Sequence, residues 1–281
     1  MKPIKSIFIL MLLSAVINQS QAQKKSLKED WIKLFNGKDL KDWDIKITGE
    51  DLGVNYKNTY RIDSGLLKIS YDQYSNFESK YGHMYYKKPY SYYKIRFEYR
   101  FVGNQIPGGA EWNVRNSGIM IHSQSAKSVT KNQEFPASLE IQLLGGLGTG
   151  ERTTANLCTP GTIVEMNGKI NPDHCINSSS KTYNGDQWVK VEAVVLGDSL
   201  ITHYMEGKPV FSYQKPHLGE DVNGKGALLK EGYIAVQAES HPIDFKSIEL
   251  LNLEGCKNPK CANYKVYYVK GVACKRCKKQ I

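Results

Sequence analysis

The feature that most constrains the fold is a run in which apolar and charged side chains alternate without a break. In residues 93–101, tyrosine, isoleucine and phenylalanine occupy every odd position, and lysine, arginine and glutamate occupy every even one. A period of two residues is typical of a β-strand that buries one face and exposes the other to water. Such a strand needs a second layer to cover its apolar face, so this run predicts a layered β fold.

Shorter runs of the same kind recur along the chain, separated by clusters of Gly, Pro, Asn and Asp. We expect further strands at 60–62, 66–69, 116–122, 139–144, 188–196, 200–205, 209–213, 232–238 and 243–251. No stretch shows the period of an amphipathic helix. Together these runs predict an all-β domain, built as a sandwich of two antiparallel sheets with almost no helix.

The two ends of the chain differ in character from the body. Residues 1–22 indicate a signal peptide, because two lysines precede an apolar run at 7–17 and Ser-Gln-Ala ends at a cleavage site after Ala22. The apolar run is too short to cross a bilayer, so we expect no integral membrane segment and an exported protein, either periplasmic or extracellular. The globular domain is expected over 30–253, followed by a basic, Cys-rich tail over 254–281.

The net charge is concentrated in that tail. Two of the 38 Lys and Arg residues lie in the signal peptide, which leaves 36 against 28 Asp and Glu residues, and the whole excess lies beyond Gly255. A neutral body with one basic tail argues against a groove for nucleic acid, so we expect no nucleic-acid partner. We expect a solvated tail, and contact with anionic envelope surfaces is the alternative.

All six cysteines lie in the second half of the chain: Cys158, Cys175, Cys256, Cys261, Cys274 and Cys277. An even number in an exported chain favours disulfides, with Cys158 bonded to Cys175 and the four tail cysteines paired among themselves. Zinc is the alternative in the tail, because the spacings C-x4-C and C-x2-C would supply four thiolates.

Three of the expected strands place hydrogen-bonding side chains on the face opposite their apolar residues. These side chains are Asn116, His122, Glu140, Gln142, Gln237 and Glu239, and His241 follows just past the last of the strands. A sheet that buries one face and shows amides and carboxylates on the other is suited to be the floor of a sugar site. The alternative is an ordinary solvated sheet face.

Two short motifs point to other chemistries but have simpler explanations. Gly-Asp-Ser-Leu at 197–200 matches a serine esterase motif, yet it lies between two mid-chain strands and no late Asp-x-x-His follows, so we expect a hairpin turn. The glycine-rich stretch at 145–150 does not match the pattern of a phosphate-binding loop, and no helix follows it.

Five blocks of sequence resemble one family. They are Leu-Phe-Asn-Gly-Lys-Asp-Leu-x-x-Trp at 34–43, Asn-Ser-Gly-Ile at 116–119, Glu-Ile-Gln at 140–142, Asp-Gln-Trp-Val-Lys-Val-Glu at 186–192 and Gly-Tyr-Ile-Ala-Val-Gln-Ala-Glu-Ser-His-Pro-Ile-Asp-Phe at 232–245. Their order over about residues 30–253 resembles the 3-keto-disaccharide hydrolase domain family. The resemblance implies a concanavalin A-like jelly-roll sandwich. Family members often have Arg in the place of His122, and many have Phe-Arg-Asn where this chain has Phe-Lys-Ser at 245–247.

The resemblance also implies cleavage of glycosides already oxidised at C3, by elimination and hydration. Such chemistry needs a base, a group that stabilises an enolate, and an acid for the leaving oxygen. We expect Glu140 to be the base or a metal-coordinating carboxylate and His122 to be the acid or the enolate partner. Sugar hydroxyls are expected to be bound by Asn116, Gln142, Gln237, Glu239 and His241.

Several alternatives stay open from the sequence. A divalent cation held by carboxylate and His would suit the enolate role, although the sequence shows none. A non-catalytic carbohydrate-binding module would use the same fold and the same polar face. A glycosidase that acts on unoxidised sugar through paired carboxylates is the third possibility.

Overall fold

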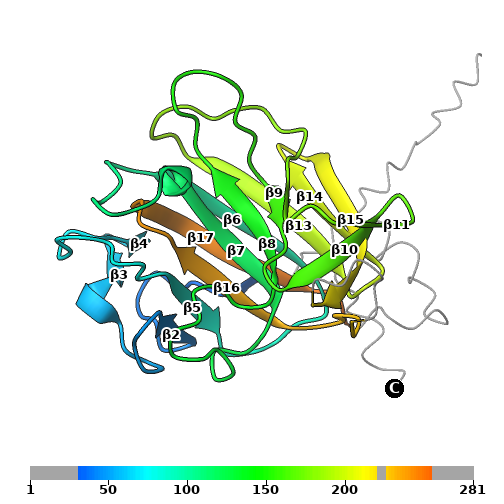
Figure 1. Ribbon diagram of the computed structural model, residues 1–281, viewed down its shortest axis with the longest axis horizontal. Coiled ribbons are helices and arrows are strands. Elements are labelled where there is room, and N and C mark those ends of the chain that lie inside the picture. The colour runs from blue at the N-terminus through cyan, green and yellow to red at the C-terminus, as the bar shows by residue number, and fades with distance from the viewer. Residues whose placement is uncertain (1–30, 220–225, 255–281) are drawn as a thin grey trace, which may run out of the picture.

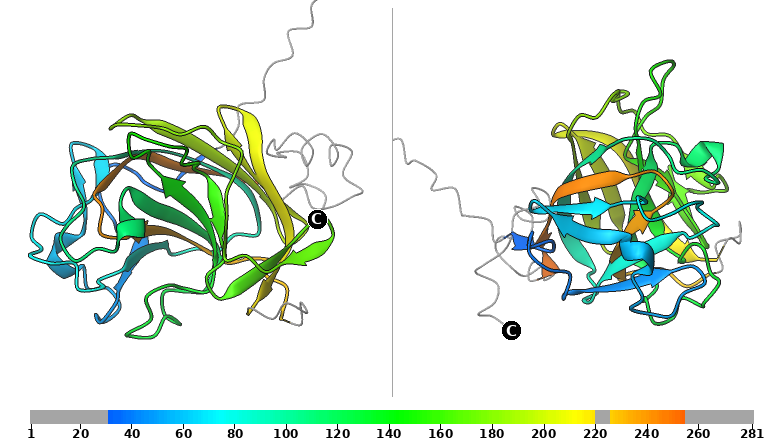
Figure 2. Two further views of the ribbon diagram at one scale, coloured as in Figure 1. Left: turned by 45° about the horizontal axis from the view of Figure 1, so that its top comes forward. Right: turned by 90° about the vertical axis from the view of Figure 1, so that its left-hand side faces the viewer.

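Two antiparallel sheets stacked face to face form the body of the protein in a computed structural model, which describes residues 31–219 and 226–254 (Figures 1 and 2). In these two ranges, helix is limited to the 3-10 turns η1 (Tyr56–Asn58) and η2 (Glu111–Asn113). The predicted all-β, two-sheet antiparallel jelly-roll sandwich is therefore confirmed.

The larger sheet is built around the alternating run from which the fold was predicted. Its strands, in order across the sheet, are β11 (Lys169–Asn171), β10 (Thr162–Met166), β15 (Lys208–Leu218), β14 (Leu200–Met205), β13 (Val189–Leu196), β6 (Tyr92–Phe101), β17 (Ile243–Asn252), β4 (Leu66–Ile69) and β3 (Tyr60–Asp63), with β1 (Ile32–Lys33) paired to β17. The alternating run is β6, which pairs with β13 on one side and β17 on the other.

The smaller, seven-stranded sheet contains all three strands with polar faces. Its order is β12 (Cys175–Ile176), β9 (Asn156–Cys158), β8 (Leu139–Leu144), β7 (Asn116–Ser123), β16 (Tyr233–Ala238), β5 (Gly82–Tyr86) and β2 (Trp43–Ile47). Strands β8, β7 and β16 are neighbours, as the floor of one site requires. The short strands β1, β2, β5 and β9–β12 were not predicted.

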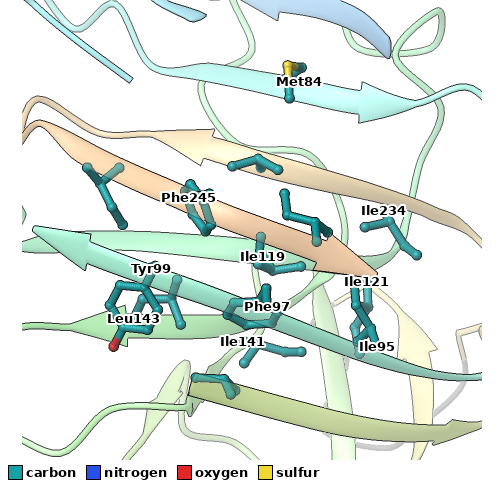
Figure 3. Close-up of a cluster of buried hydrophobic side chains, with 14 of the residues drawn as sticks. Met84, Ile95, Phe97, Tyr99, Ile119, Ile121, Ile141, Leu143, Ile234 and Phe245 are labelled. Atoms are coloured by element: carbon teal, nitrogen blue, oxygen red, sulfur yellow. The ribbon is translucent and has the colours of Figure 1, made fainter. Parts of the chain in front are cut away.

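The hydrophobic core lies between the two sheets (Figure 3). The larger sheet contributes Ile95, Phe97, Tyr99 and Phe245, and the smaller sheet contributes Ile119, Ile121, Ile141, Leu143 and Ile234, all at most 2% exposed. Burial of one such side chain stabilises the fold by roughly 1.5–3 kcal/mol, so this layer holds the sheets together. It also points the remaining side chains of β8, β7 and β16 away from the core.

The predictions for the chain ends lie outside the described residues. These are the signal peptide and the basic tail with Cys256, Cys261, Cys274 and Cys277, and they stay predictions. Within 31–219 and 226–254, no helix has the length and apolar character needed to cross a membrane.

Candidate functional site

A cleft of about 1240 Å³ lies on the outer face of the seven-stranded sheet. Its floor includes Asn116, Glu140, Gln142 and Glu239. Its walls come from three loops, at 102–115, 124–138 and 145–155, and from the β9–β12 region. The three predicted polar strand faces are thus brought to one cleft.

Glu140 faces the cleft because its neighbours in β8, Leu139 and Ile141, face the core. Only 6% of Glu140 is exposed. Its carboxyl group lies over the backbone of Gly118, where a Cβ would come within 2.5 Å of Glu140 Oε1. The absence of a side chain at position 118 therefore makes room for the carboxyl group.

Apolar surroundings raise the pKa of Glu140. Strand register places it between Cys158 of β9 and Met120 of β7. Met120 belongs to a small apolar cluster through which loop 124–138 covers part of the outer face, together with Tyr85, Ala126, Val129 and Ala235. Burial disfavours the charged carboxylate and raises the pKa of Glu140 to about 8.

Glu239 is a second buried carboxyl group in the same cleft. It follows β16 directly, is 3% exposed, and its Oε2 has no hydrogen-bond partner in the protein. Burial and then the charge of Glu140 raise its pKa well above the ordinary value, while the charge of Arg152 opposes this. Two buried carboxyl groups that repel each other do not both ionise readily, so when one of the pair loses its proton the other stays protonated.

Amide side chains on or beside the floor have atoms left without partners. Gln237, in the neighbouring strand β16, is fully buried and does not line the cleft, and neither its Oε1 nor its Nε2 is hydrogen-bonded within the protein. Asn116 donates from Nδ2 to the Trp112 carbonyl at 3.2 Å, while its Oδ1 has no partner. Gln142 is held by Asn156, whose Nδ2 donates to Gln142 Oε1 at 3.2 Å. Leaving a buried polar atom unpaired costs about 1–3 kcal/mol, so these atoms indicate a place for a polar ligand.

His122 does not lie where the strand pattern placed it, and that expectation is corrected. The pairing of β7 with β16 shifts register between Tyr233 and Ala235, and His122 takes a positive φ of 48° at this bulge. Its Nε2 lies 3.0 Å from the carbonyl oxygen of Gly197, in the turn between β13 and β14 of the other sheet. Burial lowers its pKa, and it does not line the cleft. The geometry therefore offers no support for His122 as the acid or enolate partner.

Gly232 explains why the bulge forms at this point. A Cβ at position 232 would lie 2.3 Å from the carbonyl carbon of His122, so only glycine permits this approach of the two backbones. The period of two ends at the bulge, and the side chain that follows changes its face.

His241 also lies away from the cleft surface. It is 3% exposed, and its ring contacts Phe101 edge to face at 5.6 Å between centroids. Burial and the charge of Arg115 lower its pKa to about 4, so the imidazole is neutral at pH 7. Its expected role in binding sugar hydroxyls has no support from this position, because His241 is not among the residues that line the cleft.

Two cleft residues were missed from the sequence because they come from loops. Arg152 lines the cleft, and its Nη1 donates to the Gly145 carbonyl at 2.7 Å. Trp112, in η2, lines the cleft with 54% of its surface exposed. The available signals were that loop 145–155 leaves the end of the strand carrying Glu140, and that Trp112 shortly precedes the Asn-Ser-Gly-Ile block.

The predicted disulfide between Cys158 and Cys175 is present and lines the cleft. The two cysteines face each other across the pair β9 and β12, and Cys158 in turn faces Glu140 of β8. The bond therefore ties β12, the outermost strand of this sheet, to β9, the strand beside the buried carboxyl group.

The carboxylate and the histidine that were considered as ligands for a divalent cation do not come together. Among residues 31–219 and 226–254, no three or more His, Cys, Asp and Glu side chains are grouped to hold a metal ion. Glu140 faces the cleft, whereas His122 binds Gly197. No step of the chemistry is therefore assigned to a metal at these residues.

Comparisons with known proteins agree with this architecture. Residues 30–251 match the model of a family described as a 3-keto-alpha-glucoside-1,2-lyase-like domain. A candidate glycosyl hydrolase from Parabacteroides distasonis ATCC 8503 is 15% identical over 79% of this chain and 99% of that one, with a TM-score of 0.50. A protein of unknown function with a galectin-like fold from Bacillus subtilis is 11% identical over 79% of this chain and 94% of that one, with a TM-score of 0.51. These structures show a shared fold. No curated protein sequence is significantly similar to the chain.

Proposed function

The chain belongs to the 3-keto-alpha-glucoside-1,2-lyase-like domain family, and from this we propose that it cleaves 3-keto-glucosides by elimination followed by hydration. The family resemblance inferred from the five sequence blocks is confirmed. Membership supports a glycan-acting function, and the 3-keto substrate and the chemistry below are our proposal.

The reaction follows from the acidity of the sugar. A ketone at C3 acidifies the hydrogen at C2, so a base removes that proton and leaves an enolate. The enolate electrons then form the double bond between C1 and C2, the bond from C1 to the leaving oxygen breaks, and that oxygen takes a proton. Addition of water to the resulting enone at C1 yields the free 3-keto sugar.

The buried carboxyl pair is the observation that carries this assignment. Glu140 in its ionised form is the base for the C2 proton, because it lies on the floor and its raised pKa makes it a stronger base than an ordinary carboxylate. Glu239 in its protonated form is the acid for the leaving oxygen, because burial and the charge of Glu140 favour its neutral state. Two carboxyl groups thus take opposite roles in one cleft.

The remaining cleft residues bind and orient the sugar. Asn116 lines the cleft and has an unpaired carbonyl oxygen, which suits a hydroxyl group of the sugar. Gln142, oriented by Asn156, offers a further amide. Arg152 adds a positive charge to the same cleft, which favours developing negative charge on the substrate.

We also propose that the protein acts outside the cytoplasm, in the periplasm or beyond the cell. The signal-like segment at residues 1–22 supports this, and so does the disulfide, since such bonds persist in oxidising compartments. Detection of the mature chain starting after Ala22 in an exported fraction would test it.

The decisive experiment supplies a 3-keto-glucoside and its unoxidised parent, each with and without chelator. We expect release of the aglycone from the 3-keto-glucoside alone, at a rate that falls when C2 carries deuterium and does not change with chelator. Release from the unoxidised sugar would instead identify a glycosidase. Binding of sugar without turnover of either compound would identify a carbohydrate-binding module, a role that the exposed indole of Trp112 would also suit.

A further inference from the structure

The two most exposed large apolar side chains of the described residues both line this cleft. Trp112 and Leu147 are each 54% exposed, more than any other large apolar residue in 31–219 and 226–254, and both line the cleft. Contact of apolar side chains with water is unfavourable, so their exposure at a cleft indicates a place where a ligand binds. The polar floor described above leaves this apolar part of the cleft unexplained.

Strand register places the loops that carry these two residues at one end of the floor. Asn116 at the start of β7 faces Leu144 at the end of β8. The loop before β7 and the loop after β8 therefore leave the sheet at the same end of these two strands. Trp112 lies in the first loop and Leu147 in the second, and the Trp112 carbonyl is bound by Asn116 Nδ2 at 3.2 Å. Figure 1 shows both segments beside the upper ends of β7 and β8.

The order of the two carboxyl groups along the floor gives the substrate a direction. The carboxyl group of Glu140 lies over Gly118, and Gly118 is two residues from Asn116 on β7, which is about 7 Å along a strand. Val236 faces Ile119, and continuing this register brings Glu239 beside Asn116. Glu239 is thus next to the end of the strands that carries Trp112. The base is thus farther from the end that carries Trp112 than the acid for the leaving oxygen, so the leaving group extends toward Trp112 and Leu147.

We propose that Trp112 and Leu147 form an aglycone subsite that takes a flat, neutral, apolar leaving group such as an aromatic ring. The inference rests on the proposed function, since it names the aglycone class of that same site. An indole ring gains most from stacking on another flat ring, and a Leu side chain adds apolar contact without a hydrogen-bonding requirement. Glu111 and Glu134 line the same cleft and disfavour an anionic aglycone.

The test compares benzyl and methyl 3-keto-glucosides of one anomeric configuration, because their leaving alcohols have similar acidity and differ mainly in the ring. We expect a higher kcat/KM for the benzyl compound. Trp112→Ala should lower kcat/KM about tenfold for the benzyl compound and less than about twofold for the methyl compound, as loss of one stacking contact predicts. Trp112→Phe should restore most of the preference, and Leu147→Ala should reduce it to a smaller extent.

Leu200→Ala is the matched control, since Leu200 is 42% exposed in the other sheet and does not line the cleft. It should change neither substrate. An equal loss on both substrates in Trp112→Ala, or no benzyl preference in the wild type, would overturn the inference.

Calorimetry with unoxidised benzyl and methyl glucosides separates this inference from the proposed function. If neither 3-keto compound is turned over, the proposed function fails, and the aglycone subsite is still judged by whether Trp112→Ala removes the tighter binding of the benzyl glucoside. Leu147→Ala gives the same readout if Trp112→Ala does not fold, because Leu147 is a largely exposed loop side chain. Equal binding of both glucosides by the wild type would refute the subsite in either case.

Discussion

The outer faces of the two sheets arise from the same alternating pattern but hold their polar side chains in different states. On the ten-stranded sheet the charges are paired near solvent: Lys94 Nζ lies 3.1 Å from Glu192 and Arg96 Nε lies 2.7 Å from Glu249. On the seven-stranded sheet Gln237 and Glu239 are buried, and several of their atoms have no partner in the protein.

The difference shows which polar face has a function beyond solubility. Exposed ion pairs contribute about 0–1 kcal/mol each, so the first face tolerates change. Buried, unpaired polar atoms oppose folding, and a sequence keeps them where another molecule supplies the missing partner. Loops cause the contrast, because 102–115, 124–138 and 145–155 wall in the second face.

The largest expected effect is on catalysis. Glu140→Gln keeps the size of the side chain and removes its charge, so kcat on a 3-keto-glucoside should fall by about 10²- to 10⁴-fold with binding little changed. The matched control is Glu192→Gln on the outer face of the ten-stranded sheet, which should keep full activity. If Glu140→Gln were as active as the wild type, the two faces would not differ as proposed, and Glu239 would be the next carboxyl group to replace.

The second expected effect of Glu140→Gln is on how the free energy of unfolding depends on pH. A carboxyl group whose pKa is raised by folding stabilises the folded state fully below its unfolded pKa of about 4.3, and this contribution is lost as pH rises toward the folded value, about 8 for Glu140. Glu140→Gln removes this loss. The free energy of unfolding of the variant should therefore gain on the wild type by up to about 1.4 kcal/mol per pH unit between pH 5 and 8.

Denaturant unfolding at several pH values measures this gain, and turnover by the wild type should rise over the same range because the base must be ionised. Gln142→Ala is the control, since it alters the same cleft without removing a titrating group. A constant difference between Glu140→Gln and the wild type from pH 5 to 8 would show that the carboxyl group is not buried as described.

Removal of the disulfide should have the next largest effect. Cys158 and Cys175 are separated by 17 residues, and closing a loop of this length stabilises a protein by about 3 kcal/mol on the chain-entropy model. The double variant Cys158→Ser/Cys175→Ser should lose about this much in denaturant unfolding. It should also bind sugar less well, because the bond ties the cleft wall beside Glu140. Sugar affinity unchanged despite lower stability would show that the wall does not depend on the bond.

The smallest expected effect separates binding from turnover. Gln142→Ala removes one amide from the floor, so the Kd for a 3-keto-glucoside should rise roughly five- to tenfold, as for loss of one hydrogen bond of about 1 kcal/mol. The kcat value should change less than this. A larger loss in kcat than in affinity would place Gln142 in the chemistry and would require a new assignment of roles on this face.

Local patterns in the sequence determined the sheets and most of the floor. Alternation of side chains is a property of the extended backbone itself, so β6 and β8 were predicted with the correct faces. The same reasoning brought Asn116, Glu140 and Glu239 to one cleft. The disulfide followed from the number of cysteines and the expected export.

What only the tertiary structure decided depends on contacts between segments far apart in the chain. The face of His122 is set by a bulge, and the close backbone contact at this bulge needs Gly232 just before the neighbouring strand β16, which the sequence of β7 alone does not contain. Loops bring Trp112 and Arg152 to the cleft, and no short-range period governs where a loop side chain ends. The raised pKa of Glu140 likewise arises from burial by surrounding segments, because the charge of a carboxylate is opposed by what packs around it and not by its neighbours in sequence.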